Sequence, residues 1–178
     1  MNNKEINWKN ILIKIALLAA FNIALIVGLA PLSFGPFQFR ISNLMNIFPF
    51  IFGLPGLIGV FLGGLIANFL NPFGILDILL GGVLSGGVVL GFAYFCGCQA
   101  RKYNKKQPWL FLALIASPIG TTFFVGYLLL HVIFQIPLWP LVPYFIAEEL
   151  LTSTFGGWLV YKAISRYLQG KGVYDLPN

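Results

Sequence analysis

Long blocks of apolar residues constrain this chain more than any other feature of its sequence. A helix needs about 20 predominantly apolar residues to span the hydrocarbon core of a bilayer. Blocks of this kind cover most of the 178 residues, and the mean hydropathy is +0.87. Backbone groups in lipid must form their hydrogen bonds within the protein, which favours helices as the spanning elements. The sequence therefore predicts an all-α integral membrane protein.

Prolines, glycines and charged residues divide the apolar sequence into six blocks, and we expect one transmembrane helix in each. Together they predict a six-helix bundle that forms a single transmembrane domain over residues 1–178. The sequence GLPG at 53–56 separates the two shortest blocks and allows two helices or one bent helix. The first block is longer than a signal-peptide core of roughly 7 to 15 residues, so we interpret it as a retained helix. The approximate helices are 11–30, 40–54, 56–70, 75–99, 109–134 and 141–165.

The basic residues indicate the direction of these helices. With both termini in the cytoplasm, ten of the eleven Lys and Arg residues lie on the cytoplasmic side, in agreement with the positive-inside rule. Treating 40–70 as one span would instead place the loop RKYNKK at 101–106 outside. Membrane topology therefore explains the net charge of +6 better than binding to nucleic acid does. The ten residues are Lys4, Lys9, Lys14, Arg101, Lys102, Lys105, Lys106, Lys162, Arg166 and Lys171.

Arg40 is the exception, because it falls at the outer start of the second predicted helix. Asn43 and Asn46 follow at intervals of three residues, so the three side chains share one face and descend about 9 Å into the membrane. A polar stripe that faces a ligand is one interpretation. The alternative is a headgroup anchor at Arg40 with helix-packing hydrogen bonds below it.

Other costly polar groups fall in the same outer half of the predicted bundle. Ionisable residues within spans usually face a cavity or a partner, so the cluster is a candidate binding site. Each member has an ordinary alternative: Asp77 can cap its helix, and His131 can sit at the interface. Adjacent glutamates point about 100° apart, so only one is expected to face a cavity. The cluster comprises Asn68, Asn71, Asp77, His131, Glu148 and Glu149.

The same residues argue against an enzyme. The sequence AEELL resembles the double glutamate of intramembrane metal-dependent proteases, but those sites need further histidines and this chain has one. Cys96 and Cys98 fall at the opposite face, and the glycines of GGVLSGG lie within an apolar span and not in a phosphate-binding loop. We therefore expect no catalysis, no metal and no cofactor.

Binding of a small, flat, polar molecule fits the cluster better. Carboxylates and amides suit the edge of a heterocycle, and aromatic residues in the outer connections can stack on it. No ATP-binding motif is present, so a binder of this size is expected to depend on a partner for energy. Ala16, Ala20 and Ala24 form a small-residue stripe that serves a partner helix or internal packing. The aromatic residues are Phe34, Phe37, Phe39 and Trp139.

Four strings, GPFQFRIS, IFPF, GLIGVFLGGLIANFL and GILDILLGG, resemble the QueT family over most of the chain. This family comprises the substrate-binding S components proposed to import queuosine precursors within energy-coupling factor (ECF) transporters. The resemblance implies a prokaryotic plasma-membrane protein that delivers its substrate through a transmembrane scaffold subunit and two ATP-binding subunits. It also implies that the alanine stripe contacts the scaffold. The family pattern FRISEAL reads FRISNLM here, so Asn43 replaces a glutamate.

The resemblance further implies a 7-deazaguanine ligand. The N–H donors of such a ligand would bind a carboxylate, and its carbonyl would bind an amide or an arginine. Two alternatives remain: an S component for a different vitamin-like substrate, and an assembly subunit that binds no ligand. The candidate substrate-binding residues are Gln38, Arg40, Asn43, Asn46, Asn68, Asp77, His131, Trp139, Glu148 and Glu149.

Overall fold

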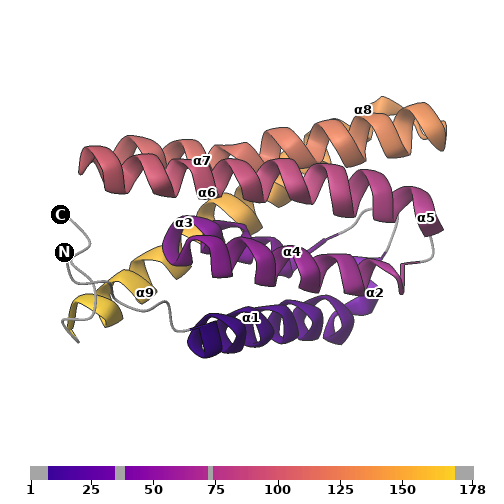
Figure 1. Ribbon diagram of the computed structural model, residues 1–178. Coiled ribbons are helices and arrows are strands. Elements are labelled where there is room, and N and C mark those ends of the chain that lie inside the picture. The colour runs from indigo at the N-terminus through magenta and orange to yellow at the C-terminus, as the bar shows by residue number, and fades with distance from the viewer. Residues whose placement is uncertain (1–7, 35–38, 72–73, 171–178) are drawn as a thin grey trace.

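The computed structural model describes residues 8–34, 39–71 and 74–170, and every regular element in these ranges is a helix (Figure 1). The predicted all-α class is confirmed for this part of the chain. Segment η1 is a 3-10 helix, and η2, η3 and η4 are π-helical. In chain order the elements are α1 (Trp8–Gly28), α2 (Ala30–Ser33), η1 (Ile41–Ile47), α3 (Phe48–Phe52), α4 (Leu54–Asn68), α5 (Gly74–Asp77), η2 (Ile78–Ser85), α6 (Gly86–Tyr103), α7 (Lys106–Thr121), η3 (Thr122–Ile133), α8 (Leu138–Glu149), η4 (Leu150–Gly156) and α9 (Gly157–Gly170).

Three helical runs are long and apolar enough to cross a membrane. They are Trp8–Gly28, Gly74–Tyr103 and Lys106–Ile133, and 18-residue stretches of them have mean hydropathies of 2.5, 2.1 and 1.8, respectively. Their outward surfaces carry exposed apolar side chains such as Phe111 and Ile119, which suit contact with lipid. Ile41–Phe52 and Leu54–Asn68 are shorter apolar runs. The chain is thus a multi-pass membrane protein.

Separate helices, α3 and α4, lie before and after Gly53, the first residue of GLPG. Gly53 has φ of 68° and ψ of −137°, a conformation that glycine adopts without steric cost. After it the chain folds back closely, and a Cβ on Gly56 would collide with the carbonyl group of Phe48. α3 and α4 therefore form a hairpin, as the two-helix interpretation predicted, and not one bent helix.

The predicted α-helix over 40–54 begins instead as the 3-10 segment η1. Pro49 has no N–H to donate to the carbonyl of Met45, and the N–H of Phe48 takes that carbonyl in a tighter turn. Residues three apart are eclipsed in a 3-10 helix, so Asn43 and Asn46 still share one face. The descent from Arg40 to Asn46 becomes about 12 Å at about 2 Å per residue, longer than the α-helical estimate.

Glycines of α4 bring α1 into backbone contact with it. A Cβ added to Gly63 would lie 2.6 Å from the carbonyl oxygen of Ala19, and one on Gly59 would lie 2.9 Å from that of Ile15. No other residue type fits at such a distance without moving a backbone. The inner face of α1 is therefore held against α4 along its length (Figure 1).

The two ends of the bundle differ in charge. The start of α1, the connection from α6 to α7 and the end of α9 lie at one end, and α5 and the start of α8 lie at the other (Figure 1). Arg40 comes directly before η1 and pairs with Asp77 of α5. It is therefore associated with the end of the bundle that contains α5. The other basic residues in the described part of the chain lie on α1, on α9 or around the connection from α6 to α7. They are Lys9, Lys14, Arg101, Lys102, Lys105, Lys106, Lys162 and Arg166.

Buried apolar side chains form two clusters. The larger includes Phe50, Ala93 and Leu114 and joins α3, α6 and α7. The smaller includes Leu129 and Phe145 and joins η3 to α8. Side chains of both clusters line one cavity between them: Val60 and Leu90 from the first, Val125 and Phe145 from the second.

Candidate ligand-binding cavity

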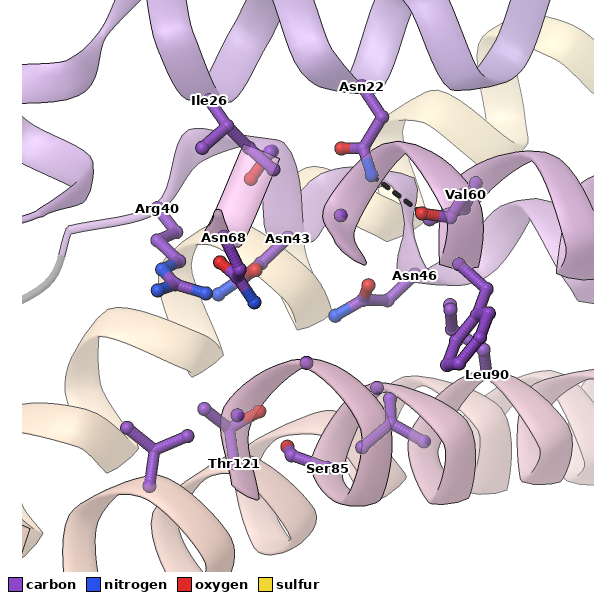
Figure 2. Close-up of a pocket in the computed structure, with 18 of the residues that line it drawn as sticks. Asn22, Ile26, Arg40, Asn43, Asn46, Val60, Asn68, Ser85, Leu90 and Thr121 are labelled. Atoms are coloured by element: carbon purple, nitrogen blue, oxygen red, sulfur yellow. Dashed lines mark hydrogen bonds between the residues drawn. The ribbon is translucent and has the colours of Figure 1, made fainter. Parts of the chain in front are cut away.

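The cavity between the two clusters has a volume of about 80 Å³. A single water needs roughly 10–15 Å³, so the space is large enough for a small organic molecule. Figure 2 shows amide and hydroxyl side chains from several helices gathered around it. Its polar side chains are Asn22 of α1, Arg40, Ser42, Asn43 and Asn46 at and before η1, Asn68 of α4, Ser85 of η2, Thr121 of α7 and Glu148 of α8.

Arg40 lines the cavity while bonded to buried Asp77. Its Nη2 lies 3.3 Å from Asp77 Oδ2, and the exposed fraction of the two side chains is 13% and 0%. Asn71 donates to the same Oδ2 at 2.5 Å. The Nε of Arg40 donates to the carbonyl oxygen of Ser33 at 3.4 Å. A guanidinium has five N–H donors, so others remain for a carbonyl or another acceptor in the cavity.

Glu148 is the glutamate that faces the cavity. It is buried, and its Oε1 accepts hydrogen bonds from the backbone N–H of Arg40 at 3.0 Å and from the hydroxyl of Thr152 at 3.1 Å. The bond from Arg40 ties α8 to the residue before η1. A carboxylate acceptor and a guanidinium donor therefore both belong to the lining of the cavity.

Glu149 lies behind the lining and does not reach the cavity. It is fully buried; its Oε1 accepts from Asn43 Nδ2 at 2.8 Å, and its Oε2 accepts from Ser117 Oγ at 2.7 Å. Asn46 Nδ2 donates to Ser117 Oγ at 2.8 Å. The carboxylate thus binds one lining amide directly and the other through a serine.

Two asparagines leave a buried carbonyl oxygen without a protein partner among the described residues. Asn22 Nδ2 donates to the carbonyl oxygen of Val60 at 2.8 Å, which leaves Asn22 Oδ1 unbonded (Figure 2). Asn68 Oδ1 also has no partner. Both residues are at most 3% exposed and line the cavity. Because an unsatisfied buried acceptor is costly, both atoms are suited to bind a ligand N–H.

Sequence reasoning missed Asn22 and Ser117 in this site. Asn22 was detectable, since it is a polar residue inside the apolar run of the first helix. Ser117 had no such signal, because a serine in an apolar helix usually bonds to its own backbone. Its role depends on Asn46 and Glu149, which come from two other segments.

Five of the ten candidate residues line the cavity, four others do not, and one cannot be placed. Asp77 and Glu149 contact the lining residues from behind. The His131 ring Nδ1 lies 2.9 Å from the carbonyl oxygen of Ile136, and Trp139 is 83% exposed, so neither reaches the cavity. Gln38 lies outside the described residues. The five lining residues are Arg40, Asn43, Asn46, Asn68 and Glu148.

Glycines of η2 make room for the polar side chains around the cavity. A Cβ on Gly82 would lie 2.9 Å from Asn68 Nδ2, and a Cβ on Gly81 would lie 2.8 Å from Asp77 Oδ1. Both glycines line the cavity themselves. In the sequence DILLGG, Asp77 and the glycine that leaves room for its side chain, Gly81, are therefore about one helical turn apart.

The stripe of Ala16, Ala20 and Ala24 lies on the exposed side of α1. The face that meets α4 is instead made by residues such as Ile15 and Ala19. The stripe therefore makes no contribution to this packing and remains open to a neighbour in the membrane.

Comparison with known proteins identifies the family of this chain. The model of the family described as QueT transporter matches residues 12–166. The queuosine precursor transporter QueT of Lactococcus lactis subsp. cremoris (strain MG1363) is 38% identical over 86 residues, which are 44% of this chain and 50% of the relative. The chain thus spans about half the length of this curated relative, and no solved structure matches. Since the family match extends over most of the chain, this protein belongs to the QueT transporter family.

Proposed function

We propose that this protein is the substrate-binding S component of an ECF importer that captures a queuosine precursor. The observation that carries the proposal is the cavity, where Arg40 and Glu148 stand beside four asparagine amides inside an apolar bundle. Such a concentration of donors and acceptors in a membrane protein is costly unless a ligand engages it. The name of the Lactococcus relative supports the choice of ligand.

The geometry suits a 7-deazaguanine, which has N–H donors and a carbonyl along one edge. Glu148 accepts from the donors, and the free N–H groups of Arg40 donate to the carbonyl. Val60, Leu90 and Phe145 provide the apolar walls for the flat ring. Both polar groups are held in place before the ligand arrives, which lowers the entropic cost of binding.

The proposal includes six spans in one transmembrane domain, with both termini in the cytoplasm. The basic residues at one end of the bundle support this orientation, since positive charge is retained on the cytoplasmic side. The cavity residues Arg40 and Glu148 then belong to the outer half. The substrate enters from outside and leaves through the action of a scaffold subunit and two ATP-binding subunits, which this chain contacts through the alanine stripe.

Binding to the detergent-purified protein tests the function. We expect 7-deazaguanine to raise the unfolding temperature, because a ligand that binds only the folded state stabilises it. Glu148→Ala removes a charged acceptor and should weaken binding about tenfold or more. His131→Ala is the control, because His131 does not line the cavity. Equal affinity of the Glu148→Ala variant and the wild type would contradict the assignment.

The alternatives give different results in the same assay. If a vitamin-like compound stabilises the protein and 7-deazaguanine does not, the S-component mechanism stands with another substrate. If no compound in a panel of deazaguanines and vitamins stabilises it, the queuosine-precursor proposal fails. A subunit that serves assembly alone then becomes the better explanation.

A further inference from the structure

The hydrogen bonds around the cavity determine which end of three lining amides faces inward. A backbone carbonyl only accepts, so the contact between Asn22 and Val60 must use the Asn22 NH₂ group and leave its oxygen free. A carboxylate also only accepts, so Asn43 directs its NH₂ group to Glu149. In both residues the carbonyl oxygen is the group that remains for a ligand.

Asn46 is oriented by the same logic through Ser117. A serine hydroxyl has one proton, and Ser117 donates it to Glu149 Oε2 at 2.7 Å. Ser117 must therefore accept from the NH₂ group of Asn46, which lies 2.8 Å away. The oxygen of Asn46 again remains for the cavity. The direction of this bond depends on a carboxylate that does not itself line the cavity.

We propose that Glu149 and Ser117 are positioning residues that turn the amides of Asn43 and Asn46 so that the cavity presents acceptor oxygens. The oxygens of Asn22 and Asn68, which have no partner among the described residues, and the carboxylate of Glu148 then add three more acceptor groups to the lining. Such a wall selects a ligand that inserts an edge with several N–H donors. Arg40 is the charged donor of the lining. This inference rests on the proposed function, because it specifies how the same site distinguishes its substrate.

Glu149→Gln tests the inference with almost no change in volume. Asn43 and Ser117 bond different oxygens of Glu149, and a glutamine has an NH₂ group in place of one of them, so only one of the two donors keeps an acceptor. If its NH₂ group meets Asn43, that amide must turn and direct its own NH₂ into the cavity. If it meets Ser117, the serine proton turns to Asn46, and that amide must reverse. In either case the cavity loses one acceptor.

Two matched ligands measure the loss. 7-Deazaguanine and 7-deazahypoxanthine differ only in the exocyclic amino group, which is an N–H donor. The wild type should prefer 7-deazaguanine by about tenfold or more, because the analogue leaves buried acceptors unpaired. In the Glu149→Gln variant this preference should fall by about tenfold. Calorimetric titration of the detergent-purified full chain gives both affinities.

A double variant separates positioning from general structural damage. In Glu149→Gln with Asn43→Asp the new amide donates to the new carboxylate, whose second oxygen faces the cavity, and the total formal charge is that of the wild type. The preference for 7-deazaguanine should return. Ser117→Ala is a further variant that releases Asn46 alone, and it should lower the preference while Glu149 stays in place.

The outcomes separate this inference from the proposed function. A reduced preference that the double variant restores supports it. An unchanged preference for 7-deazaguanine in both Glu149→Gln and Ser117→Ala would overturn the inference and leave the proposed function intact. The same holds if Glu149→Gln lowers the affinity for both ligands equally and the double variant does not restore it. If the wild type binds neither compound, the proposed function and this inference fail together.

Discussion

Arg40 and Asp77 form an ion pair across 3.3 Å in which the acid is completely buried and the base retains 13% of its exposure. The pair joins the chain before η1 to the end of α5. Asp77 also accepts from Asn71, whereas its Oδ1 has no partner among the described residues. The buried carboxylate of Asp77 therefore depends more on its partner than the partly exposed guanidinium of Arg40 does.

Arg40→Ala is predicted to destabilise the protein more than Asp77→Ala does. Without Arg40, a fully buried carboxylate loses its cation, a change that costs about 3–5 kcal/mol at buried pairs. Without Asp77, the partly exposed guanidinium can turn toward water or lipid headgroups. Thermal unfolding in detergent compares the two variants, and the double variant should recover part of the loss. Equal destabilisation by the two single variants would contradict this explanation.

Gly82→Ala is predicted to weaken ligand binding without unfolding the protein. The added Cβ would lie 2.9 Å from Asn68 Nδ2, so the Asn68 side chain must move within the cavity. Loss of its hydrogen bond to a ligand should cost about 1 kcal/mol, or roughly fivefold in affinity. Gly87→Ala is the matched control, because its Cβ would make an ordinary contact of 3.8 Å with Phe61. Titration of both variants with 7-deazaguanine measures the difference.

The proposed topology predicts that Lys105 and Trp139 lie on opposite sides of the membrane. They flank the 28-residue run Lys106–Ile133, which is long and apolar enough to cross a membrane. In a variant in which Cys96 and Cys98 are replaced by serine, a membrane-impermeant maleimide added to intact cells should label Trp139→Cys and not Lys105→Cys. Labelling of both positions, or of Lys105→Cys alone, would show that the assigned orientation is wrong.

Ala20→Leu is predicted to block association with the scaffold subunit while ligand binding and stability stay unchanged. Ala20 is exposed on α1, so a larger side chain disturbs no contact within the protein. Ala19→Leu is the contrasting variant, since Ala19 faces Gly63 of α4, and it should destabilise the fold by about 1–3 kcal/mol. Co-purification with the scaffold and thermal unfolding measure the two effects. Normal co-purification of the Ala20→Leu variant would show that the partner binds elsewhere.

Much of the architecture was predictable from local sequence. The apolar blocks are long enough to indicate helices, and the break at Gly53 was visible as GLPG. The three-residue spacing of Asn43 and Asn46 placed them on one face, and this held even though η1 proved to be a 3-10 helix. Each of these features is determined by residues that are close together in the sequence.

The sequence by itself determined the helical membrane class and the placement of most basic residues outside the apolar runs, and it predicted that polar residues from separate segments gather, because lipid penalises exposed backbone and charge wherever they occur. Only the tertiary structure decided that Glu148 faces the cavity and Glu149 lies behind it, that Asn22 joins the site, and that Trp139 stays outside. Those outcomes depend on the rotation of each helix about its axis. Contacts between distant segments set that rotation, such as Ala19 against Gly63 and Asn46 against Ser117, and no local spacing encodes them.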